Sequence, residues 1–219
     1  MSLLLTGISI LILGESHMAF NGQLISTLPD ELAQQGAQVY SYGVCGASAG
    51  DWLISKPSPC SAFRMGTGPI RTRPADIATT QPIGELIKKH QPDLIIVVIG
   101  DTMASYDNKT IPKSWVWQNT SALTTEINKN GTRCVWVGPT WGQDGGVYHK
   151  TNARVREFSD YLYTLVSPCT YVNSLNFVKE GEWKTIDGQH LDKAGYEGWA
   201  RGITQSIMSP PILSTLKKH

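Results

Sequence analysis

The sequence predicts an α/β fold of three layers, with a mainly parallel five-stranded sheet between two layers of helices. Short apolar runs of the length of buried strands recur along the 219 residues, and stretches with helical periodicity lie between them. Glycine or proline stands where several of the helical stretches should end. A chain of this length can bury one large core, so we expect a single domain over residues 1–219.

The expected strands are short apolar runs. They span residues 8–13, 38–43, 93–99, 133–138 and 170–174. Because a helical stretch separates each run from the next, the strands should lie parallel and be joined by right-handed crossovers. In such a sheet, ligands bind at the carboxyl ends of the strands.

The expected helices span residues 21–35, 83–90, 114–130, 152–166 and 192–208. Pro29 should kink or restart the first helix, since proline lacks the amide hydrogen that a helix interior uses. Gly36, Pro92 and Gly131 stand where helices should stop.

Two segments lack this alternation of apolar runs and helical stretches. Residues 56–82 hold five prolines and are expected to form a long loop, which in a compact domain is usually functional or disordered. Its arginines, Arg64, Arg71 and Arg73, either face an anionic or sugar-like substrate or are scattered, solvated charges. Residues 209–219 are expected to form a frayed terminus.

The charge balance argues against a polyanionic partner. The formal net charge is +1 and no long basic block occurs, so we expect a small-molecule or glycan substrate and no nucleic acid. No apolar run approaches the roughly 18 residues of a membrane span, and residues 1–7 are too short for a signal peptide. The predicted location is periplasmic or secreted, with the cytoplasm as the alternative. Composition says nothing of the oligomeric state.

The four cysteines form no C-x-x-C pair, so neither a zinc site nor a redox motif is expected. Cys134 and Cys169 open two expected strands and would bridge if those strands are neighbours. Cys45 and Cys60 would close a loop beside the candidate site, while the alternative is that all four are buried thiols. His90, His149 and His219 have no partner at metal spacing, and we expect no metal and no cofactor.

Three residues form the candidate catalytic set. Ser16 follows an expected buried strand, where its hydroxyl is exposed to a ligand, but a serine hydroxyl is a weak nucleophile without a base. His190 stands three residues after Asp187, which allows the carboxylate to bond one ring nitrogen and leaves the other free to take the proton of Ser16. The pattern indicates a Ser-His-Asp hydrolase in the chain order Ser…Asp…His.

Each of these residues also has a plainer explanation. Ser16 is at a position where a serine often caps a helix, and Asp187 could cap a turn beside a surface histidine. His17 either lines the site or fills the start of the first helix, and we do not expect it to be catalytic.

With its motifs in this order, the chain resembles the SGNH, or GDSL-like, hydrolase superfamily over nearly its whole length. Residues 13–16, Leu-Gly-Glu-Ser, look like the first block, with Glu15 where aspartate is usual and Ser16 as nucleophile. Residues 42–46 look like the second block, whose last glycine, here Gly46, gives an amide to the oxyanion hole. Residues 187–190 look like the fifth block, with Asp187 orienting the base His190. The resemblance implies a flavodoxin-like fold and no cofactor.

The third block departs from the family pattern. Where the family has G-x-N-D, with the asparagine as an oxyanion donor, this chain has Gly-Asp-Thr-Met at residues 100–103. Thr102 takes the asparagine position, and its shorter side chain can donate one hydrogen bond. The oxyanion hole is therefore expected to use the amides of Ser16 and Gly46, with Thr102 or Asn108 as a further donor. Asn108 is also a candidate for binding the substrate.

This departure, together with Trp-Val-Gly-Pro-Thr-Trp at residues 136–141, looks similar to members that act on acetylated carbohydrates of bacterial envelopes. Trp141 lies past the end of its expected strand, where it either offers an aromatic face to a sugar or acyl group or packs in the interior. We expect a serine esterase that removes acetyl or other short acyl groups from a carbohydrate. The alternatives are an O-acetyltransferase acting on cell-envelope polysaccharide, a thioesterase or lysophospholipase, and an inactive carbohydrate-binding module.

Overall fold

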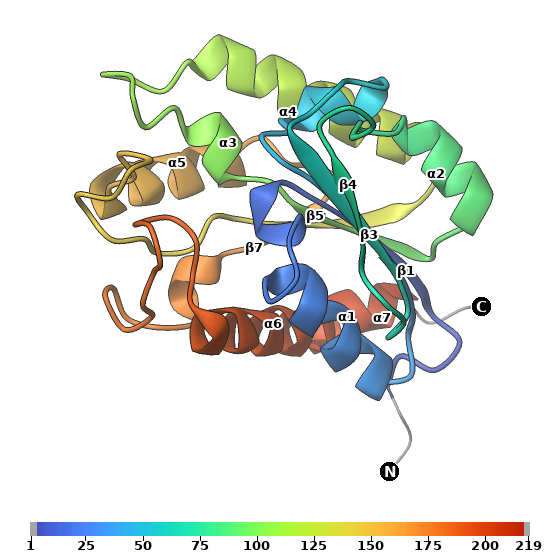
Figure 1. The fold of residues 1–219 in the computed structure, drawn as a ribbon. Coiled ribbons are helices and arrows are strands. Elements are labelled where there is room, and N and C mark those ends of the chain that lie inside the picture. Colours follow the sequence, from blue (N-terminus) through green and yellow to red (C-terminus); the bar gives the residue numbers. More distant parts are fainter. Residues whose placement is uncertain (1–3, 217–219) are drawn as a thin grey trace.

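The computed structural model describes residues 4–216 and shows a twisted sheet between two layers of helices (Figure 1). Seven strands follow one another in the order β4-β3-β2-β1-β5-β6-β7. The strands are β1 (Ser9–Gly14), β2 (Gln38–Val44), β3 (Cys60–Met65), β4 (Arg71–Pro74), β5 (Leu94–Val98), β6 (Arg133–Val137) and β7 (Thr170–Val172). The five strands from β2 to β7 in this order are parallel, which confirms the predicted three-layer α/β fold.

Five helices match the expected ones within a few residues. They are α1 (Leu24–Gln34), α2 (Ile83–His90), α4 (Lys113–Lys129), α5 (Asn152–Tyr163) and α6 (Lys193–Ile207). Two further helices, α3 (Asp101–Ala104) and α7 (Pro210–Leu216), were not expected. Short 3₁₀ turns lie at η1 (Ser16–Met18), η2 (Ala49–Leu53) and η3 (Ser174–Asn176). Pro29 lies inside α1, which continues as one helix to Gln34 and does not restart.

The sheet is buried on both faces because successive side chains of a strand point to opposite sides. In β1, Ile10 and Ile12 belong to the core under α1, α6 and α7, while Leu11 and Leu13 belong to the core under α2, α4 and α5. All four side chains are fully buried. This explains why the central strand reads as one unbroken apolar run.

The prediction of a long loop over residues 56–82 is wrong for residues 60–74. β3 and β4 form an antiparallel hairpin there, and β3 pairs with β2. Pro69 lies between the two strands and Pro74 ends the outermost one, positions where proline costs no hydrogen bond inside the sheet. Pro69 and Pro74 therefore mark the two ends of the edge strand β4 and not a continuous loop.

The arginines of this segment have structural partners. Arg64 is buried and donates to the carbonyl oxygens of Ser26 and Gly68, with an ion pair to Asp30. Arg71 and Arg73 lie over the ring of Phe63, at 5.7 and 5.6 Å from its centroid. Arg64 thus anchors the hairpin to α1 and does not face a substrate.

The predicted frayed terminus is also wrong for the residues that the structure describes. Residues 210–216 form α7, whose Ile212 and Leu216 are buried in the core beside α6. The apolar side chains at i and i+4 explain the helix, since they lie on one face. Residues 1–3 and 217–219 lie outside the described residues.

Among residues 4–216, no helix is both long and apolar enough to cross a bilayer.

Candidate active site

The candidate site lies at the carboxyl edge of the parallel strands. Ser16 follows β1, Gly46 follows β2 and Thr102 follows β5, so the sheet brings three segments that are far apart in sequence to one edge. His190 comes from the segment just before α6. A cleft of about 590 Å³ opens here, and all four residues line it.

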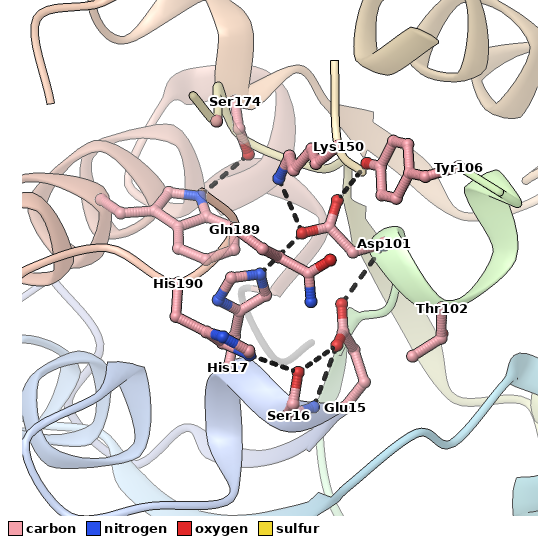
Figure 2. Close-up of polar contacts among 12 residues, drawn as sticks. Glu15, Ser16, His17, Asp101, Thr102, Tyr106, Lys150, Ser174, Gln189 and His190 are labelled. Atoms are coloured by element: carbon pink, nitrogen blue, oxygen red, sulfur yellow. Dashed lines mark hydrogen bonds and ion pairs between the residues drawn. The ribbon is translucent and has the colours of Figure 1, made fainter. Parts of the chain in front are cut away.

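Ser16, His190 and Asp187 form a continuous hydrogen-bonded chain. His190 Nε2 lies 2.8 Å from Ser16 Oγ (Figure 2), and His190 Nδ1 lies 2.7 Å from Asp187 Oδ2. The other oxygen of Asp187 accepts the backbone N–H groups of Gln189 and His190, which closes the D-x-x-H turn. Gly188 is required in this turn, because its φ is +92° and a Cβ would lie 2.6 Å from Gly146 Cα.

The charge of Asp187 decides which ring nitrogen of His190 carries the hydrogen. Burial alone would raise the pKa of Asp187, but the hydrogen bonds from the backbone and ring of His190 outweigh it and lower the pKa. The carboxylate is thus charged at neutral pH and accepts the hydrogen of Nδ1. With its hydrogen on Nδ1, the imidazole presents Nε2 as an acceptor, and Nε2 faces the hydroxyl of Ser16.

Glu15 makes the second set of contacts with Ser16. Its carboxylate Oε2 accepts both the backbone N–H and the hydroxyl of Ser16, each at 2.9 Å (Figure 2). Its other oxygen accepts the backbone N–H of Asp101 at 3.2 Å. The Glu15 side chain is buried, with 1% of its surface exposed.

The three residues expected to form the oxyanion hole differ in whether their donor hydrogens already have an acceptor. The Ser16 amide is held by Glu15. The hydroxyl of Thr102 donates to the carbonyl oxygen of Ala47 at 2.8 Å, so its one hydrogen is already used and the expected donor role is wrong for this arrangement. Among residues 4–216, no acceptor takes the amide hydrogen of Gly46, whose φ of +69° suits glycine.

Asp101 is the centre of a buried charge network beneath the site. Its Oδ2 receives Lys150 Nζ at 2.7 Å and His17 Nε2 at 2.8 Å, and its Oδ1 accepts the hydroxyl of Tyr106 (Figure 2). Burial raises the pKa of Asp101, but Lys150 and His17 outweigh it and hold the pKa well below its usual range. The far nitrogen of His17 contacts the hydroxyl of Tyr196. His17 therefore fills the interior next to the start of α1 and does not touch the cleft.

Burial and the nearby negative charges raise the pKa of two tyrosines in this network. Burial and the carboxylate of Asp101 raise the pKa of Tyr106, and burial with Glu15 and Asp101 raises the pKa of Tyr196.

Sequence reasoning missed Asp101, Lys150 and Tyr106. No local motif marks them, since Lys150 lies in a loop 49 residues from its partner Asp101.

Glu15, His17 and Asp101 are a group that could hold a metal ion, because their ligand atoms lie within 4.8 Å of one another. The chemistry of the group argues against a cation. Lys150 already supplies a positive charge at Asp101, and Glu15 already accepts three hydrogen bonds. The residues do not fit a metal centre in this arrangement.

The two predicted substrate-binding residues lie elsewhere. Trp141 is 6% exposed, and its Nε1 donates to the carbonyl oxygens of Leu175 and Val178. The indole thus packs the loop after β6 against η3 and offers no face to the cleft. Asn108 is exposed outside the cleft lining and donates to Ser105 Oγ.

Other aromatic residues do border the cleft. Phe20 and Tyr148 each have 45% of their surface exposed, and Val147 next to Tyr148 is also exposed. The ring of Tyr148 packs edge-on against His190, with centroids 5.3 Å apart. Tyr148, like Trp141, lies in the loop after β6. The aromatic side chain expected in the cleft at this strand end is therefore that of Tyr148 and not that of Trp141.

Both expected cysteine pairs are disulfides, Cys45–Cys60 and Cys134–Cys169. Cys45 and Cys60 line the cleft and join the end of β2 to the start of β3, directly beside Gly46. Cys134 and Cys169 join the amino ends of β6 and β7, at the opposite edge of the sheet.

Comparison with known proteins places the chain in a family. Protein BcsX of Komagataeibacter xylinus is 42% identical over 219 residues, which are 99% of this chain and 82% of the relative. The chain belongs to the BcsX family. No protein-family model matches it.

Solved structures with the same fold are much more distant in sequence. An acetyl xylan esterase superposes with a TM-score of 0.60 at 12% identity, over 91% of this chain and 100% of the esterase. A GDSL-like lipase from Bacteroides thetaiotaomicron has a TM-score of 0.59 at 14% identity, over 91% of this chain and 87% of the lipase. The fold is therefore that of the SGNH, or GDSL-like, hydrolases, which confirms the resemblance seen in the sequence.

The buried pair of Lys150 and Asp101 gives a stability prediction. Lys150→Met leaves the Asp101 carboxylate buried without its cation, and we expect the free energy of unfolding to fall by about 3–5 kcal/mol in urea denaturation. Lys193→Met is the control, because Lys193 is exposed and only loosely paired. A loss in Lys150→Met no larger than in the control would contradict the account.

The pair of Asp101 and Lys150 also makes the free energy of unfolding depend on pH. The pKa of Asp101 is lower in the folded than in the unfolded chain, so its contribution is complete above about pH 4 and is lost as the pH falls further. Lys150→Met removes the largest of the interactions that lower the pKa of Asp101, so the part of the acid destabilisation due to Asp101 should shrink. Unfolding measured between about pH 5 and pH 2 should show a shallower slope in Lys150→Met than in the wild type or Lys193→Met.

Proposed function

We propose that this protein is a serine esterase that removes short acyl groups, acetyl above all, from a carbohydrate through an acyl-enzyme. The observation that carries the proposal is the unbroken chain from Asp187 through His190 to Ser16, which ends in an open cleft. A capping serine beside a surface histidine would not need these contacts. The fold shared with an acetyl xylan esterase and a GDSL-like lipase supports the proposal.

In the first half of the reaction, Ser16 Oγ attacks the ester carbonyl carbon while its proton passes to His190 Nε2. The charged Asp187 stabilises the imidazolium that forms. The amide of Gly46 donates to the oxyanion, and the amide of Ser16 does so once it is free of Glu15. The carbon–oxygen bond to the alcohol then breaks, and His190 returns its proton to the leaving alkoxide, which departs as the sugar hydroxyl.

In the second half, His190 takes a proton from water as the water oxygen attacks the acyl carbon. Collapse of this intermediate breaks the bond to Ser16 Oγ, which receives the proton from His190. The carboxylic acid leaves and the resting serine is restored. No group besides the ester and water is consumed.

The cleft suits a carbohydrate ester. The exposed rings of Phe20 and Tyr148 offer apolar faces of the kind that pack on sugar rings, while Asp107 and Gln189 offer polar groups. We also propose a periplasmic or secreted location. Two disulfides in a chain of this size favour an oxidising compartment, where such bridges persist.

The direct test is the turnover of p-nitrophenyl acetate by the wild type, Ser16→Ala and His190→Ala. Removing the nucleophile or the base should lower kcat on the order of 10³-fold or more. Ser214→Ala, an exposed hydroxyl on α7, is the matched control and should keep the wild-type rate. Wild-type turnover no faster than that of Ser16→Ala would refute the esterase.

The two disulfides give a second test of the mechanism. Cys45→Ser with Cys60→Ser frees the loop that holds the Gly46 amide, and we expect kcat to fall on the order of 10-fold to 100-fold. Cys134→Ser with Cys169→Ser, at the opposite edge of the sheet, should lower thermal stability but keep kcat. Equal loss of kcat in both double variants would show that the Cys45–Cys60 bridge has no special part in positioning Gly46.

A further inference from the structure

Glu15 holds both hydrogen atoms that Ser16 must use. One carboxylate oxygen, Oε2, accepts the amide N–H and the hydroxyl of Ser16 at 2.9 Å each. In the proposed reaction the amide hydrogen stabilises the oxyanion and the hydroxyl hydrogen passes to His190. The same acidic side chain therefore occupies both functions in the free protein.

The hydroxyl hydrogen has two competing acceptors. Ser16 Oγ lies 2.9 Å from Glu15 Oε2 and 2.8 Å from His190 Nε2, but a serine hydroxyl carries a single hydrogen. When that hydrogen points at Glu15, it is not available to the neutral ring of His190. Nucleophilic attack then requires the hydrogen to turn from Glu15 to His190.

The amide hydrogen is also contested. A carboxylate accepts a stronger hydrogen bond than a neutral ester carbonyl, so a substrate carbonyl entering the cleft does not easily displace Glu15 from the Ser16 amide. The hydroxyl of Thr102 is engaged with Ala47, and only the Gly46 amide among the three expected donors is free. A second donor for the oxyanion must come from release of the Ser16 amide.

Glu15 is held from the side away from the cleft. It is 1% exposed and does not line the cleft, and its Oε1 accepts the amide of Asp101, the residue at the centre of the network with Lys150 and His17. This third contact involves neither hydrogen of Ser16. The carboxylate therefore keeps a donor when it gives up Ser16.

We propose that Glu15 acts as a latch, that is, as a side chain that holds the amide and hydroxyl hydrogens of Ser16. Release of these two groups from Glu15 controls acylation. The proposal rests on the proposed esterase function. Glu15 acts through Ser16 and does not touch the substrate, so it is a positioning residue. Release is driven by substrate that is bound well enough by the cleft to compete for the Ser16 amide, so the latch disfavours small esters with few contacts.

Shortening the side chain tests the latch. An aspartate at this helix-capping position prefers the amides two or three residues onward, so Glu15→Asp should free the amide of Ser16. Glu15→Gln keeps an oxygen at the same reach but removes the charge, which weakens the contact and leaves it in place. Glu85→Asp, an exposed residue on α2, is the control for the loss of one methylene.

The first measurement is the kcat and KM for p-nitrophenyl acetate. Because one oxyanion donor changes turnover by roughly 10²-fold, we expect kcat of Glu15→Asp to rise by about 10-fold or more, with little change in KM. Glu15→Gln should rise by less, and Glu85→Asp should match the wild type. A purely structural role predicts the opposite order, with Glu15→Asp the poorest enzyme, and that order overturns the latch while leaving the esterase intact.

The second measurement follows the backbone ¹H–¹⁵N resonance of Ser16 and does not depend on activity. A charge-assisted hydrogen bond moves the amide proton downfield, so the wild-type resonance should lie downfield of that in Glu15→Asp. An unchanged resonance overturns the latch, whatever the rates. If neither the wild type nor Glu15→Asp turns over ester faster than Ser16→Ala, the esterase is refuted and the latch falls with it, and the resonance then reports only whether Glu15 holds the Ser16 amide.

Discussion

The contact between His190 Nε2 and Ser16 Oγ joins residues 174 positions apart, and it depends on how the sheet is built. β1 lies between the parallel strands β2 and β5, so Ser16 leaves the sheet where the ends of β2 and β5 also arrive. α6 packs on the face of the sheet that α1 covers, which brings the segment before it back over β1. The short turn from Asp187 to His190 then sets the ring orientation. A shift in any of these elements would separate base and nucleophile.

A second constraint is the charge balance beneath the site. Asp101, Lys150 and His17 are buried together, and an unpaired charge at this depth would be costly. Asp101 also contributes its backbone N–H to Glu15, so the network and the nucleophile are connected through one carboxylate. Thr102 lines the cleft, but its hydroxyl donates to the carbonyl oxygen of Ala47, so this segment is the part of the site that differs most from the family pattern. The same acidic residue that departs from the family motif, Glu15, is the one that controls the hydrogens of Ser16.

Sequence reasoning succeeded where the pattern is local. The central strands are continuous apolar runs, and Ser16, Gly46 and the D-x-x-H turn are short motifs at strand or helix ends. It failed where the outcome depends on distant partners. Pro69, before β4, and Pro74, at its end, look like loop residues until the hairpin is seen to form the sheet edge. Trp141 looks exposed until Leu175 and Val178 are seen to accept its N–H. No pattern in the sequence marks Lys150, because its role comes from its contact with Asp101, which is 49 residues away in the sequence.

The central claim is that the fold makes Ser16 an activated nucleophile through His190. Mass spectrometry after treatment with a serine-directed fluorophosphonate tests it directly, since the reagent modifies a serine only when a base takes its proton. The account predicts one adduct, on Ser16, that forms in the wild type and is lost in His190→Ala. No adduct on Ser16, or one that forms at the same rate without His190, would contradict it.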